Sequence, residues 1–297
     1  MEETARAKIL NVDDNEAGRY SSTRLLTQAG FEVMEAATGA EALKLATRIP
    51  DLILLDVNLP DMNGFEVCRR LKSEPATCAV PVLHLSATYK DSKHTVNGLE
   101  GGADGYLTQP VEPPVLLAHV NALIRSSRLE RRLARVNRSL KALSDCNQAM
   151  LHAESELELV REVCRTLVEV GGHRFVWVGS REQDAERTVL PIATWGEDEG
   201  LLGLAKASWD ESPAGCCPMG EAIRTGKPFL FQDIRTDSRC EPWRTEALKL
   251  GFISAFALPL IIGRDVWGAI NICSETTGIF DDEERGLLSE LAQDLAL

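Results

Sequence analysis

The chain has 297 residues, of which 44% are hydrophobic, and this length allows about two globular domains with ordinary cores. Its formal net charge of −13 argues against affinity for nucleic acid or for an anionic membrane surface, so we expect neither as a partner. The acidic N-terminus does not fit a signal peptide, and the longest apolar run, residues 252–262, is far shorter than the ~20 residues of a spanning helix. We therefore expect a cytoplasmic protein.

The first half of the chain alternates short apolar runs with amphipathic segments. The apolar runs, each of which ends in or is followed by polar residues, are 8–14, 52–55, 82–86 and 105–110, and Pro50 and Pro60 bracket the second of them. The amphipathic segments are 16–29, 39–49, 64–73, 92–100 and 113–126. The five amphipathic segments indicate five strand-helix units, and units of this length predict an α/β fold, a doubly wound five-stranded parallel sheet with right-handed crossovers.

Carboxylates follow two of these runs. Asp13 and Asp14 end the first run, and Asp56 follows the run that begins at Leu52. Because the carboxyl ends of parallel strands form the ligand crevice of an open sheet, we expect the three side chains to converge there. Clustered carboxylates repel one another unless a cation lies among them, and oxygen ligands favour Mg²⁺. The pattern predicts a magnesium site.

Other polar residues follow the later runs. Ser86 ends one run, and the next contains Tyr106 and reaches Gln109-Pro110. Together with the three carboxylates, their order and spacing resemble a response-regulator receiver domain, which has a flavodoxin-like fold, over residues 6–126. This resemblance implies that the protein receives a phosphoryl group from a histidine kinase or a phosphotransfer protein.

The resemblance also assigns a role to each residue of the site. Asp56 would be the phosphoacceptor, Ser86 would bond the phosphoryl group, and Tyr106 would be the aromatic side chain that reorients. The implied Mg²⁺ ligands are Asp13, Asp14, Asp56 and the backbone carbonyl of Asn58.

Gln109 departs from the receiver pattern, in which a lysine normally precedes this proline. An amide keeps a donor for the phosphoryl oxygen but loses the charge-assisted bond, which is roughly twice as strong as a neutral one. Slow or weak phosphorylation is consistent with this change. The alternative is a receiver-shaped docking module that takes no phosphate, although three retained carboxylates argue against it.

The helical pattern continues beyond residue 126. A seam with steps of four and three, as in a coiled coil, runs through six hydrophobic residues and one asparagine: Leu129, Leu133, Val136, Leu140, Leu143, Asn147 and Met150. A lone asparagine on such a seam fixes the register of parallel dimers, so we expect a homodimer through the helix of residues 113–150. The alternative is an amphipathic helix that packs on its own chain.

From residue 155 the hydrophobic period changes. Strands are expected at 175–178, 189–192, 229–231, 255–260 and 266–272, with short helices at 219–226 and 242–250, and this order indicates an α+β domain with an antiparallel sheet. The segments 218–228 and 233–237, with the helix start at Phe280-Asp-Asp-Glu-Glu284, resemble a GAF domain over residues 145–297.

The resemblance to GAF domains names no ligand, because such domains bind cyclic nucleotides, tetrapyrroles, small metabolites or nothing. Five tryptophans could wall a pocket or pack in the core: Trp177, Trp195, Trp209, Trp243 and Trp267. The eight cysteines lack a C-x-x-C pair and fit reduced thiols. Three of them lie in segments where a thiol could be reached, namely Cys216, Cys217 and Cys240.

These patterns predict a receiver domain at 1–126, a helical coiled-coil linker at 127–154 and a GAF domain at 155–297. We interpret the chain as a two-component signalling protein in which phosphorylation of Asp56 acts through the linker on a GAF sensory or dimerisation domain. The alternatives are a small-molecule sensor whose receiver serves for docking, and the sensory part of a histidine kinase whose catalytic module is absent. The sequence contains no kinase motif, so we expect no enzyme within it.

Overall fold

A computed structural model describes residues 6–86, 102–197, 207–212 and 215–296 of the chain. The chain divides into two compact units, residues 1–132 and 133–297, and each is described by itself. Within the described parts of the chain, every helix is too short or too polar to span a lipid bilayer.

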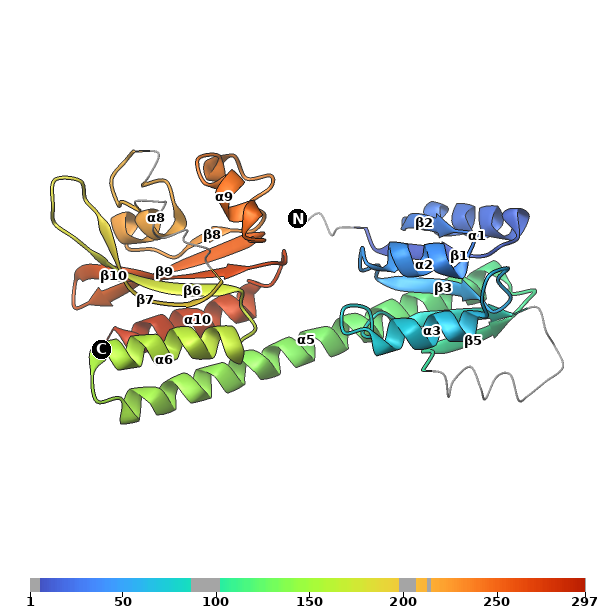
Figure 1. Ribbon diagram of the computed structural model, residues 1–297, viewed down its shortest axis with the longest axis horizontal. Coiled ribbons are helices and arrows are strands. Elements are labelled where there is room, and N and C mark those ends of the chain that lie inside the picture. Colours follow the sequence, from blue (N-terminus) through green and yellow to red (C-terminus); the bar gives the residue numbers. More distant parts are fainter. Residues whose placement is uncertain (1–5, 87–101, 198–206, 213–214, 297) are drawn as a thin grey trace. The chain divides into compact units, whose positions relative to one another are not determined.

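The first unit is built on a five-stranded parallel sheet with the strand order β2-β1-β3-β4-β5 (Figure 1). Its strands are β1 (Lys8–Val12), β2 (Glu32–Ala36), β3 (Leu52–Asp56), β4 (Val82–Ser86) and β5 (Gly105–Thr108). The helices between them are α1 (Glu16–Gln28), α2 (Gly39–Ala46) and α3 (Gly64–Ser73), and α5 (Pro113–His152) follows β5. This is the doubly wound fold expected from the alternating runs; the expected helix at 92–100 lies outside the described residues.

Two cores cover the two faces of this sheet. On one face, α2 and α3 pack on side chains such as Leu10 and Leu55, and on the other face, α1 and the start of α5 pack on side chains such as Leu54. The strand β3 is apolar on both faces because it is buried on both, which is why its sequence does not alternate.

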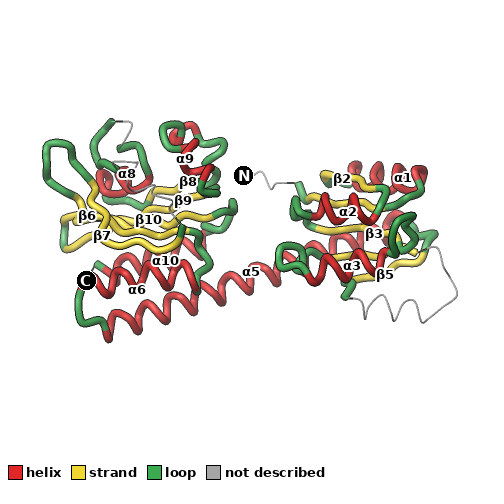
Figure 2. Tube along the Cα trace, viewed as in Figure 1, coloured by secondary structure: helices red, strands yellow, loops and turns green. Residues whose placement is uncertain are grey.

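The second unit has an antiparallel sheet with the order β7-β6-β10-β9-β8 (Figure 2). Its strands are β6 (Phe175–Arg181), β7 (Val189–Gly196), β8 (Phe229–Phe231), β9 (Ser254–Ile262) and β10 (Asp265–Ser274). Its helices are the end of α5, α6 (Glu156–Glu169), α8 (Pro218–Thr225), α9 (Arg244–Lys249) and α10 (Asp282–Leu295), with the short 3-10 helix η1 (Ser238–Cys240). The expected α+β arrangement is confirmed.

The helices of this unit separate onto the two faces of the sheet. The end of α5, with α6 and α10, packs on one face through Cys146, Cys164 and Leu291, and α8 and α9 pack on the other through Met219 and Ala247 (Figure 2). The second face is the one that holds the cavity described below.

The helix α5 continues past residue 126, and this continuation is what its hydrophobic pattern predicts. Its heptad seam is divided between two environments. Leu143 and Met150 pack against the core of their own unit, whereas Leu133 and Leu140 are 63% and 49% exposed. Asn147 is exposed as well. Part of the seam thus packs within its own chain and part of it is exposed, so the homodimer stays a prediction, as does the division at residues 126 and 154.

Candidate functional site

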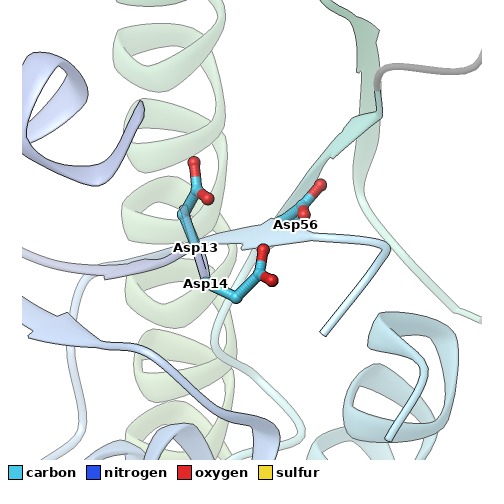
Figure 3. Close-up of side chains that lie close together, drawn as sticks. All are labelled: Asp13, Asp14 and Asp56. Carbon is cyan, nitrogen blue, oxygen red and sulfur yellow. The ribbon is translucent and has the colours of Figure 1, made fainter. Parts of the chain in front are cut away.

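The carboxyl ends of β1 and β3 form the site in the first unit. These strands are neighbours in the sheet although β2 lies between them in the sequence, so the chain leaves them in opposite directions. Such a switch point opens a crevice where ligands of α/β sheets bind. Asp13, Asp14 and Asp56 lie there as the sequence predicts, each offering a carboxylate oxygen within 4.8 Å of the other two (Figure 3).

Asp13 is held by hydrogen bonds to residues that follow it in the sequence. Its Oδ1 accepts the backbone N–H of Asn15 at 2.8 Å, and its backbone carbonyl accepts Arg19 Nη1 at 2.6 Å. Asn15 in turn caps α1 by accepting the N–H of Gly18. A β-carbon at position 18 would lie 2.8 Å from Asp13 Oδ2, so glycine leaves the space that the carboxylate occupies. The start of α1 thus holds the buried carboxylate in place.

Asp56 lies where β3 leaves the sheet and enters the loop to α3. Its Oδ1 accepts the N–H of Val57 at 2.9 Å, and the backbone carbonyl of Val57 accepts the N–H of Gly64 at 2.8 Å. A β-carbon on Gly64 would lie 2.2 Å from the backbone oxygen of Asp56, so only glycine allows α3 to start this close to the strand end. Asn63 caps α3 and fixes the same approach.

The environment of the cluster opposes ionisation. Burial, with the charge of Asp13 next in weight, raises the pKa of Asp56 from its usual value to about 6. Burial also raises the pKa of Asp13, against the hydrogen bond from Asn15 that lowers it. Asp14 is exposed at the edge of the cluster. A carboxyl group that is only half ionised near pH 6 becomes fully charged once a cation or a hydrogen-bond donor compensates it, so the cluster is suited to take up a positive ion.

The remaining expected site residues come from neighbouring strand ends. Ser86 is buried at the end of β4, and its backbone carbonyl accepts the N–H of Gln109 at 2.7 Å, which places Gln109 beside it. Asn58 lies exposed two residues after Asp56. Tyr106 is half-buried on β5 and lies opposite His84 in the parallel register, one pleat before the Ser86 pair. All four lie on segments at or near the same edge of the sheet.

A cavity lies between the sheet and α8 and α9 in the second unit. It encloses about 620 Å³ of space between protein atoms, with the solvent at its mouth included. Trp177, Phe231 and Trp243 are among its aromatic walls. Trp209 instead donates its indole N–H to the backbone of Glu182, outside the cavity. Two of the five expected tryptophans therefore line this cavity.

Two buried polar atoms face this cavity without a partner among the described residues. They are Trp243 Nε1 and Oδ1 of Asn271, a side chain that is only 7% exposed. The sequence reasoning missed Asn271, although a lone asparagine within the apolar run of β10 was its signal. A buried polar atom without a partner costs about 1–3 kcal/mol, so such atoms mark a place where a ligand can bind.

The cysteines of this unit differ from expectation. Cys217 and Cys240 are buried and line the cavity, so the expectation of reachable thiols is wrong for both; Cys216 is half-buried. Cys217 accepts the N–H of Gly220 at 3.2 Å and so caps α8, which turns its side chain inward. Burial raises the pKa of both Cys217 and Cys240 to about 11.

Comparisons with known proteins agree with both halves of the structure. The family model of the response regulator receiver domain matches residues 9–121, and that of the GAF domain matches residues 153–297. The response regulator PleD of Caulobacter vibrioides is 44% identical over 121 residues, which are 40% of this chain and 26% of PleD. The chain thus spans about a quarter of that relative.

Two further relatives are receiver proteins. The alkaline phosphatase synthesis transcriptional regulatory protein PhoP of Bacillus subtilis is 37% identical over 203 residues, 64% of this chain and 80% of PhoP. The receiver domain of the sensor histidine kinase PA1611 from Pseudomonas aeruginosa, solved with a magnesium ion in its active-site cleft, is 28% identical with a TM-score of 0.38, over 40% of this chain and 98% of that one. The chain belongs to the response-regulator family, with a receiver domain followed by a GAF domain.

Proposed function

We propose that this chain is a two-component signalling protein whose receiver accepts a phosphoryl group on Asp56. The observation that carries the proposal is the meeting of Asp13, Asp14 and Asp56 at the switch point of the sheet. Of the three, Asp56 alone ends β3, and it is only partly buried, so an incoming phosphodonor can reach it. The donor would be the phosphohistidine of a histidine kinase or of a phosphotransfer protein.

In the proposed reaction a carboxylate oxygen of Asp56 attacks phosphorus. A new O–P bond forms as the bond from phosphorus to the donor breaks, and the donor leaves with the bonding electron pair. Ser86 and the amide of Gln109, both at the strand ends beside Asp56, would donate hydrogen bonds to the transferred oxygens. Positioning and compensation of charge supply most of the catalysis in this chemistry.

The acidic cluster fits Mg²⁺. Mg²⁺ takes oxygen ligands, and one carboxylate oxygen of each of the three side chains already lies within 4.8 Å of the other two, so the three could close on one ion. Asp13, Asp14, Asp56 and the backbone carbonyl of Asn58 would hold it. When bound, the ion compensates the charge that the phosphoryl oxygens and the attacking carboxylate bring together.

Labelling with a small acyl phosphate tests the phosphoacceptor. Incubation with acetyl phosphate and Mg²⁺ should add one phosphate to the intact protein by mass spectrometry, and Asp56→Asn should abolish the addition. Asp51→Asn is the matched control, because Asp51 lies at the other end of β3, where its carboxylate accepts the N–H of Lys8. A folded wild-type protein that takes no phosphate at any donor concentration would favour the docking-module alternative.

For the output, we propose that α5 carries the change from the receiver to the GAF domain within a parallel homodimer, with Tyr106 as the reorienting aromatic. The homodimer is supported by an exposed stripe at heptad-like spacing on α5, which consists of Leu133, Leu140, Asn147 and Leu151. Leu133→Glu with Leu140→Glu should convert a dimer to a monomer in sedimentation, whereas Leu190→Glu, an exposed leucine on β7, should not. A wild-type monomer at micromolar concentration would contradict the dimer.

A second function, ligand sensing by the GAF domain, is favoured by the cavity with its two unpartnered polar atoms. A ligand that satisfies both atoms binds the folded domain and stabilises it by mass action. The two functions are compatible, since they use different units of the chain.

A further inference from the structure

Ligand sensing by the GAF domain, on which the following inference rests, leaves the chemical class of the ligand open, and the cavity walls restrict it. Among the described residues, none that lines the cavity is an acid, a lysine, an arginine or a histidine. An ion enclosed there would lose its hydration without gaining a partner of opposite charge. The penalty for an uncompensated buried ion is several kcal/mol, which a small ligand cannot recover from its contacts.

The thiols in the walls do not supply charge either. Burial raises the pKa of Cys217 and Cys240 to about 11 and that of Cys273 to about 12, so all three are neutral at physiological pH. Neutral thiols in an apolar wall behave as small hydrophobic groups. The cavity therefore presents sulfur, methyl and aromatic surface to its occupant.

The two polar atoms define the complementary groups of the ligand. Asn271 comes from β10 at the floor of the cavity, and its Nδ2 already donates to Cys273 Sγ at 3.4 Å, which leaves its Oδ1 as an acceptor. Trp243, which precedes α9, contributes an indole N–H that only donates. The aromatic walls, Trp177, Phe231 and Phe252 with Trp243 itself, favour flat rings.

We propose that the cavity binds a small uncharged ring compound that donates a hydrogen bond to Asn271 and accepts one from Trp243, and that it rejects anions, cyclic nucleotides included. A lactam ring, in which N–H and C=O are adjacent, has this pattern. The selectivity comes from described walls that carry no compensating charge, and the orientation comes from the two hydrogen bonds.

The test uses the purified full chain and isothermal titration calorimetry. The probes are 2-pyridone and 2-quinolone as neutral lactams, and 2-quinolone-4-carboxylate as the anionic match. We expect 2-quinolone to bind and its carboxylate to bind at least about 100-fold more weakly. Trp243→Phe and Asn271→Leu should each weaken 2-quinolone about 5- to 10-fold, the loss of one hydrogen bond.

Trp267→Phe is the matched control. Trp267 Nε1 is also buried without a partner among the described residues, but its ring packs on the opposite core, so this variant should bind like the wild type. Without ligand, Asn271→Leu should melt about 2–4 °C higher, because it removes an unpaired buried amide. If Asn271→Leu does not fold, the affinity of Trp243→Phe for 2-quinolone still tests the proposed hydrogen bonds.

The outcomes separate the ligand class from the sensory function. Binding of the carboxylate as tight as that of 2-quinolone, or equal affinity in Trp243→Phe and wild type, overturns the proposed class and leaves a sensory cavity in place. Failure of 2-pyridone and 2-quinolone to bind at millimolar concentration overturns the neutral-ring class, whereas the sensory function would be contradicted only if ligands of other classes failed as well.

Discussion

The receiver and the GAF domain of this chain both place polar groups at a site, but they handle charge in opposite ways. The receiver gathers three carboxylates at an open sheet edge, where Asp14 is exposed and a hydrated ion can enter. The GAF domain has a cavity whose unpartnered polar atoms, among the described residues, are an amide oxygen and an indole N–H. An open edge tolerates excess charge because water and ions screen it, whereas an enclosed cavity does not.

The opposite core of the GAF unit follows the same rule. Glu284 is buried there, but it accepts a hydrogen bond from Ser139 of α5 and lies 3.5 Å from His173 Nε2. Next to it, Arg135 of α5 pairs with Asp281 at the start of α10. In this unit the buried Glu284 has partners, whereas none of the described residues that line the cavity carries a charge. The comparison therefore predicts that an uncompensated negative charge costs more stability in the cavity than at the receiver edge, and that an added positive charge is useful at that edge.

The largest effect is expected from Asn271→Asp, which adds a carboxylate of almost the same shape to the cavity. An uncompensated buried charge should destabilise the GAF unit by about 3–5 kcal/mol at neutral pH. The folded-state pKa of the new group would lie above its unfolded value, so the loss is present at high pH and disappears as pH falls below about 4.

Urea unfolding followed by tryptophan fluorescence measures this loss, since all five tryptophans lie in the second unit. Asn137→Asp is the control, because the same change on an exposed position of α5 away from the heptad seam should stay within about 0.5 kcal/mol. A loss as small in Asn271→Asp as in the control would show that the cavity supplies compensation, and the contrast between the two units would then fail.

A smaller effect of opposite sign is expected from Asp56→Asn. The pKa of Asp56 is raised to about 6 in the folded protein, so its ionised form costs stability above pH 6, and this cost fades as pH falls from 6 towards 3.8. Without a divalent ion, Asp56→Asn should therefore be more stable than wild type at pH 7.5, by on the order of 1 kcal/mol after allowance for solvent screening. The two proteins should converge near pH 4.

Circular dichroism during urea unfolding, with EDTA or with Mg²⁺, checks this prediction. Mg²⁺ should stabilise the wild type more than Asp56→Asn, so the difference in their free energies of unfolding should become smaller. Asp51→Asn should instead lower stability, because Asp51 accepts the N–H of Lys8 and pairs with Arg128. If Asp56→Asn is less stable than wild type in EDTA at pH 7.5, the ionised carboxylate of Asp56 does not destabilise the folded receiver, and the prediction is wrong.

Much of the receiver could be predicted from the sequence because its signals are local. Apolar runs buried on both faces mark the strands, and a carboxylate that follows such a run must lie at the strand end. Parallel pairing then brings Asp13 and Asp56 to the same edge whatever the loops do. The heptad seam on α5 was less informative, because the same pattern serves a helix packed on its own chain and a helix packed on a second copy.

The GAF cavity could not be predicted in the same way. A bulge in β10 between Val266 and Gly268 shifts the alternation of the strand, so Val266 and Ala269 face the same core although they are three residues apart. Strict alternation from Val266 would have turned Asn271 away from the cavity. The side chain of Cys217 points inward because its sulfur accepts the N–H of Gly220 at the start of α8. The polar residues and glycines around Cys217 in the sequence do not predict this hydrogen bond.

The smallest effect is expected from Gln109→Lys, which adds charge at the receiver edge, where the comparison says that it is useful. Gln109 lies beside Ser86, so an ammonium there can pair with a phosphoryl oxygen on Asp56, and a charge-assisted bond is about twice as strong as a neutral one. A gain of roughly 1 kcal/mol in the transition state corresponds to about 5-fold faster labelling by acetyl phosphate, measured by mass spectrometry over time. Gln148→Lys is the control, because it changes the net charge equally at an exposed position of α5. Equal acceleration in both variants would mean that the net charge of −13 repels the donor, and no acceleration in either would mean that residue 109 does not touch the phosphoryl group.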